Sequence, residues 1–363
     1  MKEAAWFAGS GRKMEADQVR AFEAFSARFG NRFRWYERSE DDVVASILPL
    51  HADDVRWASQ IATRCALPIV PVGAGTAPDD GSGARRNAVQ IRFDLMSGTN
   101  LSKDDEEWIE AEPGASWLQL DNELRRRGRG LAVYPTSAPR ATVGGWLATD
   151  GIGVGSFEFG RLYENVISAT VVGRGGEMRE IGSDELGRYF MPMKAGSVVV
   201  GARLRTRRAA TDRVFAAAFQ DVRSLAGAVG DLASSETPLW HLAFVSPAMA
   251  AARGLRSRYL LFGAYPGHRD GEGWWELRRR VLEARGGAEL DVPEAWLVWG
   301  ERFFPVAPGH RTPDAAREFV PLADLPRVLE DANPTDALQG TVSRSGETLI
   351  LTLSAGVDTV GPG

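Results

Sequence analysis

Glycine gathers in three stretches of this chain, and these stretches constrain its fold more than any other feature. The chain has 363 residues, of which 40 are glycine. The clusters fall at residues 73–83, 144–160 and 173–176. Because glycine has no Cβ, it is favoured where a backbone turns sharply or approaches another group closely. The pattern therefore predicts loops that approach either a ligand or another backbone segment.

The first glycine loop ends a short β-rich run and reads Pro71-Val72-Gly73-Ala74-Gly75-Thr76. A diphosphate needs several backbone N–H groups converging on one point with no Cβ in the way, which Gly73 and Gly75 allow. The loop is not the dinucleotide fingerprint, which needs three spaced glycines opening a helix, and no Gly-Lys-Ser/Thr of a P-loop follows. Taken alone, it is better explained as an ordinary β-turn.

The second glycine-rich region is a long tract of small residues from Tyr134 to Arg161. Pro135 and Pro139 fix a loop, and the pair Gly144-Gly145 leads into a short helical turn. A large flat ligand needs such close approach of the backbone on one side. A purely structural role explains so long a tract of small residues less well.

Together, the two loops resemble the FAD-binding domain of the vanillyl-alcohol oxidase/p-cresol methylhydroxylase (PCMH) superfamily, especially its glycolate oxidase and D-lactate dehydrogenase branch. That family has a Pro-Gly-Gly-Thr loop on the pyrophosphate and a later Ala-Thr-x-Gly-Gly segment along the flavin. The corresponding segments here are Pro71 to Thr76 and Ala141 to Gly145. The segments Glu112-Pro113-Gly114, Glu164-Asn165-Val166 and Val171-Val172-Gly173 match the family too. The resemblance covers residues 43–207 strongly and the remainder weakly.

The resemblance implies FAD as the cofactor and assigns its contacts by position. The diphosphate contacts are Pro71, Val72, Gly73, Ala74, Gly75 and Thr76. The flavin and ribityl contacts are Pro135, Ser137, Thr142, Gly144, Gly145 and Thr149, with Gly155 and Phe159 beside them and Val199 near the adenine or pyrophosphate end. Family members often attach flavin through His or Cys near these loops, and neither loop contains one. We therefore expect FAD to be bound non-covalently.

The sequence also departs from the family pattern. Where the family reads Gly-Thr-Leu-Gly, this chain has Gly196-Ser197-Val198-Val199. A His-Gly-Asp-Gly-Asn motif, which helps the catalytic branch to bind metal and hydroxy acid, is absent. The closing Asn-Pro-Gly segment is missing, because Asn333-Pro334 is not followed by glycine. These departures put the catalytic competence of the isolated chain in doubt.

Hydrophobic periodicity and the resemblance predict an α+β fold in three parts. Residues 1–42 form a helical lead-in, with a helix from Gln18 to Phe29. Residues 43–210 form a two-subdomain FAD-binding domain of the PCMH type, opening with a β–α–β unit. Ser116 is expected to cap a helix from Trp117 to Arg127, and Val166 to Gly173 with Met178 to Ile181 to form a β-hairpin. Residues 211–363 form a compact α+β (ferredoxin-like) cap lobe, for which we expect an antiparallel sheet with helices on one face. The expected cap strands are 214–219, 240–245, 259–265, 340–344 and 348–353, and the expected helices are 221–232, 273–284 and 325–331.

Composition excludes several classes of function. The net charge is −5 and the pI about 5.6, so the basic footprint of a nucleic-acid-binding protein is absent. The single cysteine, Cys65, excludes an intramolecular disulfide and an iron–sulfur cluster held by this chain's own thiolates. No window is long and apolar enough for a signal peptide or a membrane-spanning helix. We therefore expect a cytoplasmic protein. We also expect no bound metal, because the four histidines lack metal-ligand spacing.

Two residues are candidates for contact with substrate. Arg302 lies in an aromatic segment, Ala295 to Phe304, whose default interpretation is core packing. The segment also resembles the family's Trp-x-x-Arg stretch, whose arginine can face a substrate carboxylate. A guanidinium grips a carboxylate with two N–H groups, although Glu301 could instead neutralise it. His310 follows Pro308-Gly309 and is the best candidate for a general base, the alternative being a plain loop histidine. His51 and His241 fall in predicted apolar strands and are expected to be satisfied core or surface residues, and His268, in a glycine-rich turn, is expected to face solvent.

Two hypotheses of function remain open. The first is an FAD-dependent oxidoreductase, an oxidase or a dehydrogenase, that oxidises a small 2-hydroxy acid or related alcohol by hydride transfer to flavin. The second is a non-catalytic FAD-binding subunit of a larger oxidase or dehydrogenase complex, similar to the small flavin subunit of glycolate oxidase. The first requires a small-molecule substrate, and the second requires a redox partner subunit. The sequence names neither the substrate nor the electron acceptor.

Overall fold

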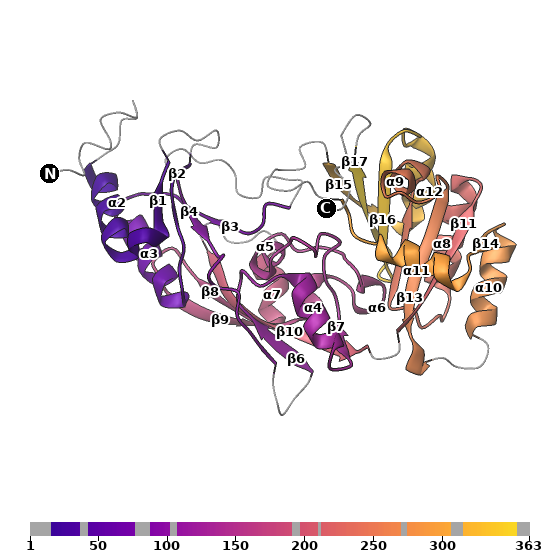
Figure 1. The fold of residues 1–363 in the computed structure, drawn as a ribbon, viewed down its shortest axis with the longest axis horizontal. Helices are drawn as coiled ribbons and strands as arrows, with labels where there is room; N and C mark the ends of the chain where they lie inside the picture. The colour runs from indigo at the N-terminus through magenta and orange to yellow at the C-terminus, as the bar shows by residue number, and fades with distance from the viewer. Residues whose placement is uncertain are drawn as a thin grey trace.

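Three β-sheets follow one another along the long axis of the molecule (Figure 1). The computed structural model describes residues 16–36, 43–76, 88–101, 107–190, 197–209, 212–269, 274–305 and 315–353. Helices and strands are mixed in the manner of an α+β protein, which confirms the predicted fold class. The boundaries expected at residues 42/43 and 210/211 stay predictions, since both fall next to or within segments outside the described residues.

The first sheet contains four strands in the order β1-β2-β4-β3. The strands are β1 (Phe33–Trp35), β2 (Val43–Ile47), β3 (Ile69–Val72) and β4 (Ala88–Arg92). Two helices pack with it, namely α2 (Ala16–Phe29) and α3 (Ala52–Arg64). The predicted β–α–β unit is confirmed, because α3 joins β2 to β3 and both strands pair with β4 in parallel. The unit ends where β3 reaches the first glycine loop.

The second sheet contains six antiparallel strands. They are β5 (Thr99–Leu101), β6 (Trp108–Ala111), β7 (Arg129–Leu131), β8 (Val166–Val172), β9 (Met178–Gly182) and β10 (Val198–Arg208). Its helices are α4 (Trp117–Arg125), α5 (Val143–Leu147), α6 (Ser156–Phe159) and α7 (Ser183–Phe190). The β8–β9 hairpin is confirmed by its antiparallel register. The predicted cap of α4 is confirmed too, because the Ser116 hydroxyl accepts a hydrogen bond from the backbone N–H of Gln119.

The third sheet contains seven antiparallel strands in the order β14-β11-β13-β12-β16-β17-β15. They are β11 (Asp212–Phe219), β12 (His241–Val245), β13 (Tyr259–Pro266), β14 (Ala288–Glu289), β15 (Ala315–Pro321), β16 (Ala337–Ser343) and β17 (Glu347–Leu353). The associated helices are α8 (Val222–Ser234), α9 (Pro247–Ala252), α10 (Trp274–Ala284), α11 (Val292–Gly300) and α12 (Leu325–Asp331). We call this part of the molecule the cap.

The expectation that helices cover only one face of the cap sheet is wrong. Helices α8, α10 and α12 pack on one face, whereas α9 and α11 pack on the other. The reason lies in the strands, because apolar residues occupy both faces: Phe215 and Ala217 point to one side, and Ala216 and Ala218 to the other. The second face also meets the six-stranded sheet in one continuous apolar core, so the cap is packed onto the glycine-rich half.

Buried ion pairs fix the connection between the six-stranded sheet and the cap. Arg207 binds Asp212 through both terminal nitrogens, at 2.8 and 2.5 Å. Arg125 bridges Asp212 and the buried Asp121, at 3.1 and 2.7 Å. The Arg207 guanidinium carbon lies 3.5 Å from the centre of the Trp240 ring, at the start of β12. This arrangement sets the position of β12 relative to the glycine-rich tract.

Candidate functional site

The two glycine loops, distant in sequence, lie against each other. A Cβ on Gly73 would lie 2.7 Å from the Thr142 hydroxyl oxygen and 3.1 Å from the Gly145 Cα. A Cβ on Gly145 would lie 3.1 Å from the same hydroxyl and 3.6 Å from the Gly73 Cα. Any larger residue at Gly73 would push the loops apart, so glycine is required for this contact. The structure thus joins the two motifs that the sequence singled out.

The rest of the first loop is open. Gly75 has a φ of +68°, and a Cβ built on it would meet no atom of the described residues within 4 Å. Ala74 and Gly75 are exposed, while Gly73 and Thr76 are half-buried. The positive φ is a conformation that glycine adopts without strain. Space therefore remains beside this loop for the groups that its backbone amides can bind.

The residues of the two loops fit an FAD bound alongside their contact. The Thr142 hydroxyl oxygen is buried and has no hydrogen-bond partner in the described part of the chain. It lies at the N-terminus of α5, where two backbone N–H groups already have acceptors. The N–H of Val143 donates to the Ala115 carbonyl at 2.9 Å, and that of Gly144 donates to the Pro113 carbonyl at 2.8 Å. An orphaned hydroxyl beside a glycine cradle is the arrangement that a ligand would complete.

The remaining predicted FAD residues fall into two groups. Pro135, Ser137, Thr142, Gly144 and Thr149 lie on the segments that surround α5, and the Thr149 hydroxyl donates to the Trp146 carbonyl at 3.2 Å. Val199 is 3% exposed within the apolar core, so its side chain is not available to a ligand. Phe159 is half-buried, and its carbonyl accepts from the Asn165 amide at 2.7 Å.

Gly155 faces the cap rather than open space. A Cβ there would lie 2.0 Å from the Ala132 carbonyl and 2.5 Å from the Trp240 indole nitrogen. The same indole N–H donates to that carbonyl at 2.9 Å. Glycine at position 155 is therefore explained by packing between the glycine-rich tract and β12. Its prediction as a cofactor contact stays untested.

The cap is hydrogen-bonded to the predicted flavin segments at several points. The backbone N–H of Phe304 donates to the Thr136 carbonyl at 2.9 Å. Arg317 on β15 donates to the Asp150 carbonyl at 2.9 Å. Asp150 has a φ of +47°, which is unusual outside glycine, and its buried carboxylate binds Arg161 at 3.0 Å. Arg161 in turn binds Glu347 on β17 at 2.5 Å, so cap strands hold this loop.

Arg302 lies directly after α11 and beside the predicted flavin loop. Its Nε donates to the Tyr134 hydroxyl at 3.2 Å, and its Nη1 donates to the Trp299 carbonyl at 3.0 Å. The guanidinium carbon lies 4.6 Å from the Trp299 ring centre and 4.1 Å from that of Phe303. Within the described residues it forms no ion pair, so the alternative in which Glu301 neutralises it is not observed.

A second set of hydrogen bonds holds the backbone at Arg302. The Gln339 side chain on β16 donates to the Arg302 carbonyl at 2.8 Å. Arg253 donates to the Gln339 side-chain oxygen and to the Glu301 carbonyl. Burial lowers the pKa of Arg253 to about 10. Arg302 is therefore held at its backbone carbonyl and at one edge of its guanidinium.

His241 is a core residue of an apolar strand, as expected, but its ring is only partly satisfied. Its Nδ1 accepts from the Gly155 N–H at 3.4 Å, but its Nε2 is buried without a partner among the described residues. Burial, aided by the charge of Arg302, lowers the pKa of His241 to about 3. Burial also raises the pKa of Tyr134. The signal that could have found His241 is a histidine inside the otherwise apolar run from Trp240 to Val245.

The other histidines contribute nothing to this site as described. The prediction that His51 lies in a strand is wrong. The residue precedes α3, and its side chain is 62% exposed. His268 is exposed in a short 3-10 turn, as expected. His310, the predicted general base, lies outside the described residues. No group of three or more potential metal ligands occurs among the residues that the structure describes.

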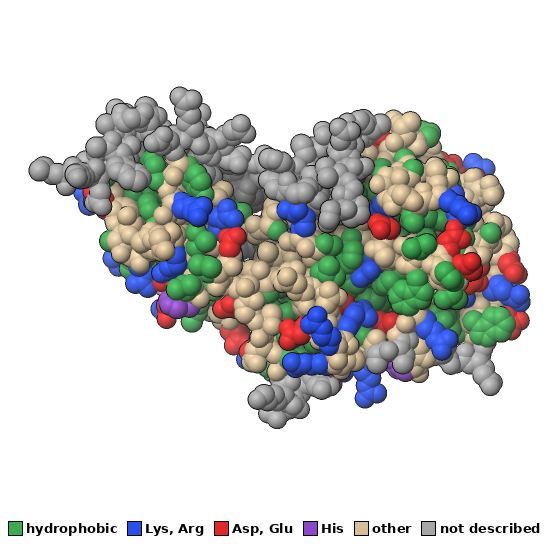
Figure 2. All heavy atoms as spheres, in the orientation of Figure 1, with side chains coloured by type: hydrophobic (Ala, Val, Ile, Leu, Met, Phe, Trp, Pro, Cys, Tyr) green, Lys and Arg blue, Asp and Glu red, His purple; other side chains and the backbone are tan. Residues whose placement is uncertain are grey.

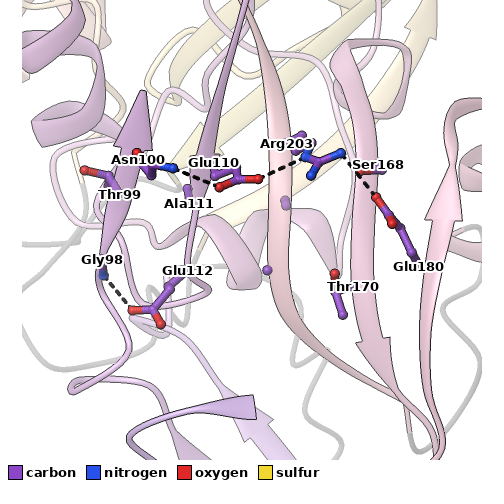
Figure 3. A pocket seen from close by; sticks show the side chains of 12 residues that line it. Gly98, Thr99, Asn100, Glu110, Ala111, Glu112, Ser168, Thr170, Glu180 and Arg203 are labelled. Carbon is purple, nitrogen blue, oxygen red and sulfur yellow. Dashed lines mark hydrogen bonds and ion pairs between the residues drawn. The ribbon is translucent and has the colours of Figure 1, made fainter. Parts of the chain in front are cut away.

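A groove of 460 Å³ lies elsewhere, on the open face of the six-stranded sheet (Figure 3). Asn100, Glu110, Arg203 and Glu180 form a chain of contacts across it, with Asn100 and Arg203 each about 3 Å from Glu110 (3.1 and 3.0 Å). None of the predicted FAD residues lines the groove. Its polar side chains satisfy one another, as on the solvated face of an antiparallel sheet.

Comparison with known proteins supports the cofactor. Residues 44–182 match the family model of the FAD binding domain. The chain is 30% identical to the mitochondrial D-lactate dehydrogenase [cytochrome] of Arabidopsis thaliana over 131 residues, which are 36% of this chain and 22% of the relative. It is 30% identical to D-2-hydroxyglutarate dehydrogenase of Pseudomonas putida over 139 residues, which are 37% of this chain and 13% of the relative. The match thus spans less than a quarter of either relative's length.

Solved structures show the same fold over nearly the whole chain. Alkyldihydroxyacetonephosphate synthase superposes with a TM-score of 0.74 and 16% identity, over 94% of this chain and 80% of that chain. p-Cresol methylhydroxylase superposes with a TM-score of 0.71 and 13% identity, over 94% and 84%. The chain therefore carries an FAD-binding domain with the fold of the vanillyl-alcohol oxidase/p-cresol methylhydroxylase superfamily, and the predicted resemblance is confirmed.

Proposed function

We propose that this protein is an FAD-dependent oxidoreductase acting on a small 2-hydroxy acid or related alcohol. The observation that carries the proposal is the contact between the two glycine loops, at Gly73 and Gly145, beneath a cap whose Arg302 forms no ion pair among the described residues. The matched relatives, a D-lactate and a D-2-hydroxyglutarate dehydrogenase, support the same class of substrate.

In this proposal the first loop, Val72 to Thr76, holds the diphosphate, and the segments around α5 hold the flavin and ribityl chain. Bound FAD supplies the hydride acceptor, while the protein supplies positioning and electrostatics. Neither loop offers His or Cys for attachment, so the cofactor is held without a covalent bond.

Arg302 is proposed to bind the substrate carboxylate. Its Nε and one Nη1 hydrogen are engaged, which leaves Nη2 and the second Nη1 hydrogen as an end-on pair of donors. A carboxylate accepts two parallel bonds from such a pair. His310 remains our proposal for the base that takes the hydroxyl proton, although it lies outside the described residues.

The second candidate function is a flavin subunit that needs a redox partner. One observation favours it: Val292, Trp296 and Leu297 on α11 are 69%, 50% and 65% exposed, and hydrophobic side chains gather in this part of the surface (Figure 2). Exposed apolar patches often mark interfaces with other proteins. In that case the isolated chain would bind FAD but would not reduce it with small substrates.

The test is anaerobic bleaching of the FAD-loaded protein by a panel of 2-hydroxy acids. The oxidoreductase proposal expects loss of the oxidised flavin band with at least one acid. If none of them bleaches the flavin while dithionite does, the oxidoreductase proposal fails for the isolated chain and the partner-dependent subunit replaces it. No membrane-crossing helix occurs among the described helices, and a cytoplasmic location remains part of the proposal.

A further inference from the structure

Beyond Arg302, the interface between the cap and the flavin segments holds two more buried polar groups. The Tyr134 side chain is fully buried, and its hydroxyl accepts from Arg302, so its own hydrogen is left to donate. The His241 ring is equally buried and lies 5.6 Å from the Trp299 ring, on which Arg302 also packs. We call Tyr134, His241 and Arg302 the donor cluster.

The tautomer of His241 follows from its contact with the backbone. Because Nδ1 accepts the Gly155 N–H, the proton of the neutral ring sits on Nε2. That Nε2–H has no acceptor among the described residues. His241 therefore serves as a donor and not as a base: taking a second proton would break the bond to Gly155 and place a charge beside Arg302.

The donor cluster contains donors in excess and no carboxylate. The Tyr134 hydrogen, the His241 Nε2–H and the free end of Arg302 find no acceptor within the described residues. Buried polar groups are nearly always paired in folded proteins, and unpaired ones destabilise the fold. Of the three, the His241 Nε2–H is the fully buried donor without an acceptor. The half-buried Arg302, which packs on the same Trp299 ring, favours a partner that brings oxygen atoms and negative charge.

We propose that Tyr134 and His241 are specificity-determining residues that, with Arg302, bind the oxygen atoms of a small carboxylate ligand at this interface. The inference rests on the proposed function and deepens it, because it selects carboxylate-bearing substrates over neutral alcohols. Arg302 supplies the charge, while the two neutral donors favour the ligand with the most acceptor oxygens. The ligand class is a short mono- or dicarboxylate.

Oxalate is a suitable probe, because it carries carboxylate oxygens and has no C–H bond to give up as hydride. Its binding to the FAD-loaded protein is measured by flavin absorbance and by calorimetry. Tyr134→Phe and His241→Phe each remove donors while keeping an aromatic ring, and each is expected to weaken oxalate about tenfold. Tyr259→Phe, on the opposite face of the cap sheet, and His51→Gln, on the surface, are matched controls expected to bind like wild type.

A second measurement uses wild-type protein labelled with ¹⁵N-histidine, so that its result does not depend on the folding of any variant. Oxalate is expected to shift the His241 Nε2–H resonance downfield. Failure of oxalate to bind wild type, wild-type affinity in both variants, or an unmoved His241 resonance would each overturn the inference. If oxalate binding depends on both residues but no 2-hydroxy acid bleaches the flavin, the proposed function fails and the anion site stands. If hydroxy acids bleach the flavin of both variants as they bleach that of wild type, the inference about Tyr134 and His241 fails and the proposed function stands.

Discussion

The glycine-rich half and the cap differ in how their residues contribute to the site. In the first half the contributions come from the backbone. Gly73 and Gly145 have no Cβ, which allows the two loops to touch, and Gly75 leaves space beside its loop. In the cap they come from side chains, since Arg302 and His241 act through groups placed by distant strands and helices. A short local sequence motif predicts the first kind of site, whereas the second kind depends on tertiary packing. The comparison predicts that substitutions in the two halves will separate cofactor binding from substrate binding.

The largest effect is expected in the first half, from Gly75→Val. A branched side chain is strained at φ +68° and points into the open space beside the loop. Loss of two diphosphate hydrogen bonds would weaken FAD about a hundredfold. The measurement is FAD affinity by fluorescence titration of the apoprotein.

Gly286→Val is the matched control for this substitution. Gly286 has a φ of +71° and nothing within 4 Å of its Cβ position, but it lies after α10 in the cap. It carries the same backbone strain and should lose stability without losing FAD affinity. Equal FAD loss in both variants would show that strain, and not the phosphate loop, is responsible.

The junction between the halves should show an effect of similar size, on stability. Arg161→Met leaves the carboxylate of Asp150, which is 2% exposed, without its ion pair, and should cost about 3 kcal/mol. Glu347→Gln removes only the more exposed partner and should cost less than about 1 kcal/mol. Urea unfolding of both variants tests the difference. Equal losses would mean that the buried pair does not hold the strained loop.

Arg302 should affect substrate and leave the cofactor alone. Arg302→Lys keeps the charge but loses the planar fork, and Arg302→Met loses both. Hydroxy-acid affinity should fall in the order wild type, Lys, Met, with the Met variant roughly ten- to a hundredfold weaker. Arg256→Met, at an exposed site, is the control. A lower melting temperature with normal reduction of the flavin by substrate would instead mark Arg302 as structural.

The smallest effect concerns acid stability and His241. Its folded-state pKa of about 3 lies below the unfolded value of 6.5, so the unfolded chain takes up the proton first as pH falls. This contribution to stability is complete above pH 6.5 and is lost towards pH 3, at about 1.4 kcal/mol per pH unit. Between pH 6.5 and 5, wild type should therefore lose about 2 kcal/mol more than His241→Phe. The free energy of unfolding of the two proteins is measured with urea at both pH values. An equal loss in the two would show that His241 is not a buried neutral ring.

The two halves also differ in how far the sequence predicted them. The β–α–β unit, the β8–β9 hairpin and the Ser116 cap were predicted because each has a local signal of periodicity or turn chemistry. The contact between Gly73 and Gly145 was not predicted, since no local rule pairs loops so far apart and the family resemblance assigned both loops only to the cofactor. Val199 was assigned by position to a cofactor contact, yet its side chain is buried in the core.

In the cap, strands and helices were largely recognised, but their packing was not. The segment containing Trp296 and Trp299 gave no clear period, because α11 buries one side and exposes large apolar residues on the other. Helix α11 helps to cover the second face of the cap sheet, and its Trp299 ring packs against both Arg302 and His241. Neither arrangement was predicted. An orphaned Nε2–H depends on what surrounds it in three dimensions, which a single histidine in a strand does not reveal.

The central claim is that the two glycine loops bind FAD without a covalent bond, and one measurement tests it most directly. The purified protein, supplied with FAD and freed of excess, is precipitated with acid, and the visible spectra of supernatant and pellet are recorded. We predict that all of the yellow flavin absorbance appears in the supernatant. Flavin retained in the pellet, or a colourless protein that takes up no FAD, would contradict the account.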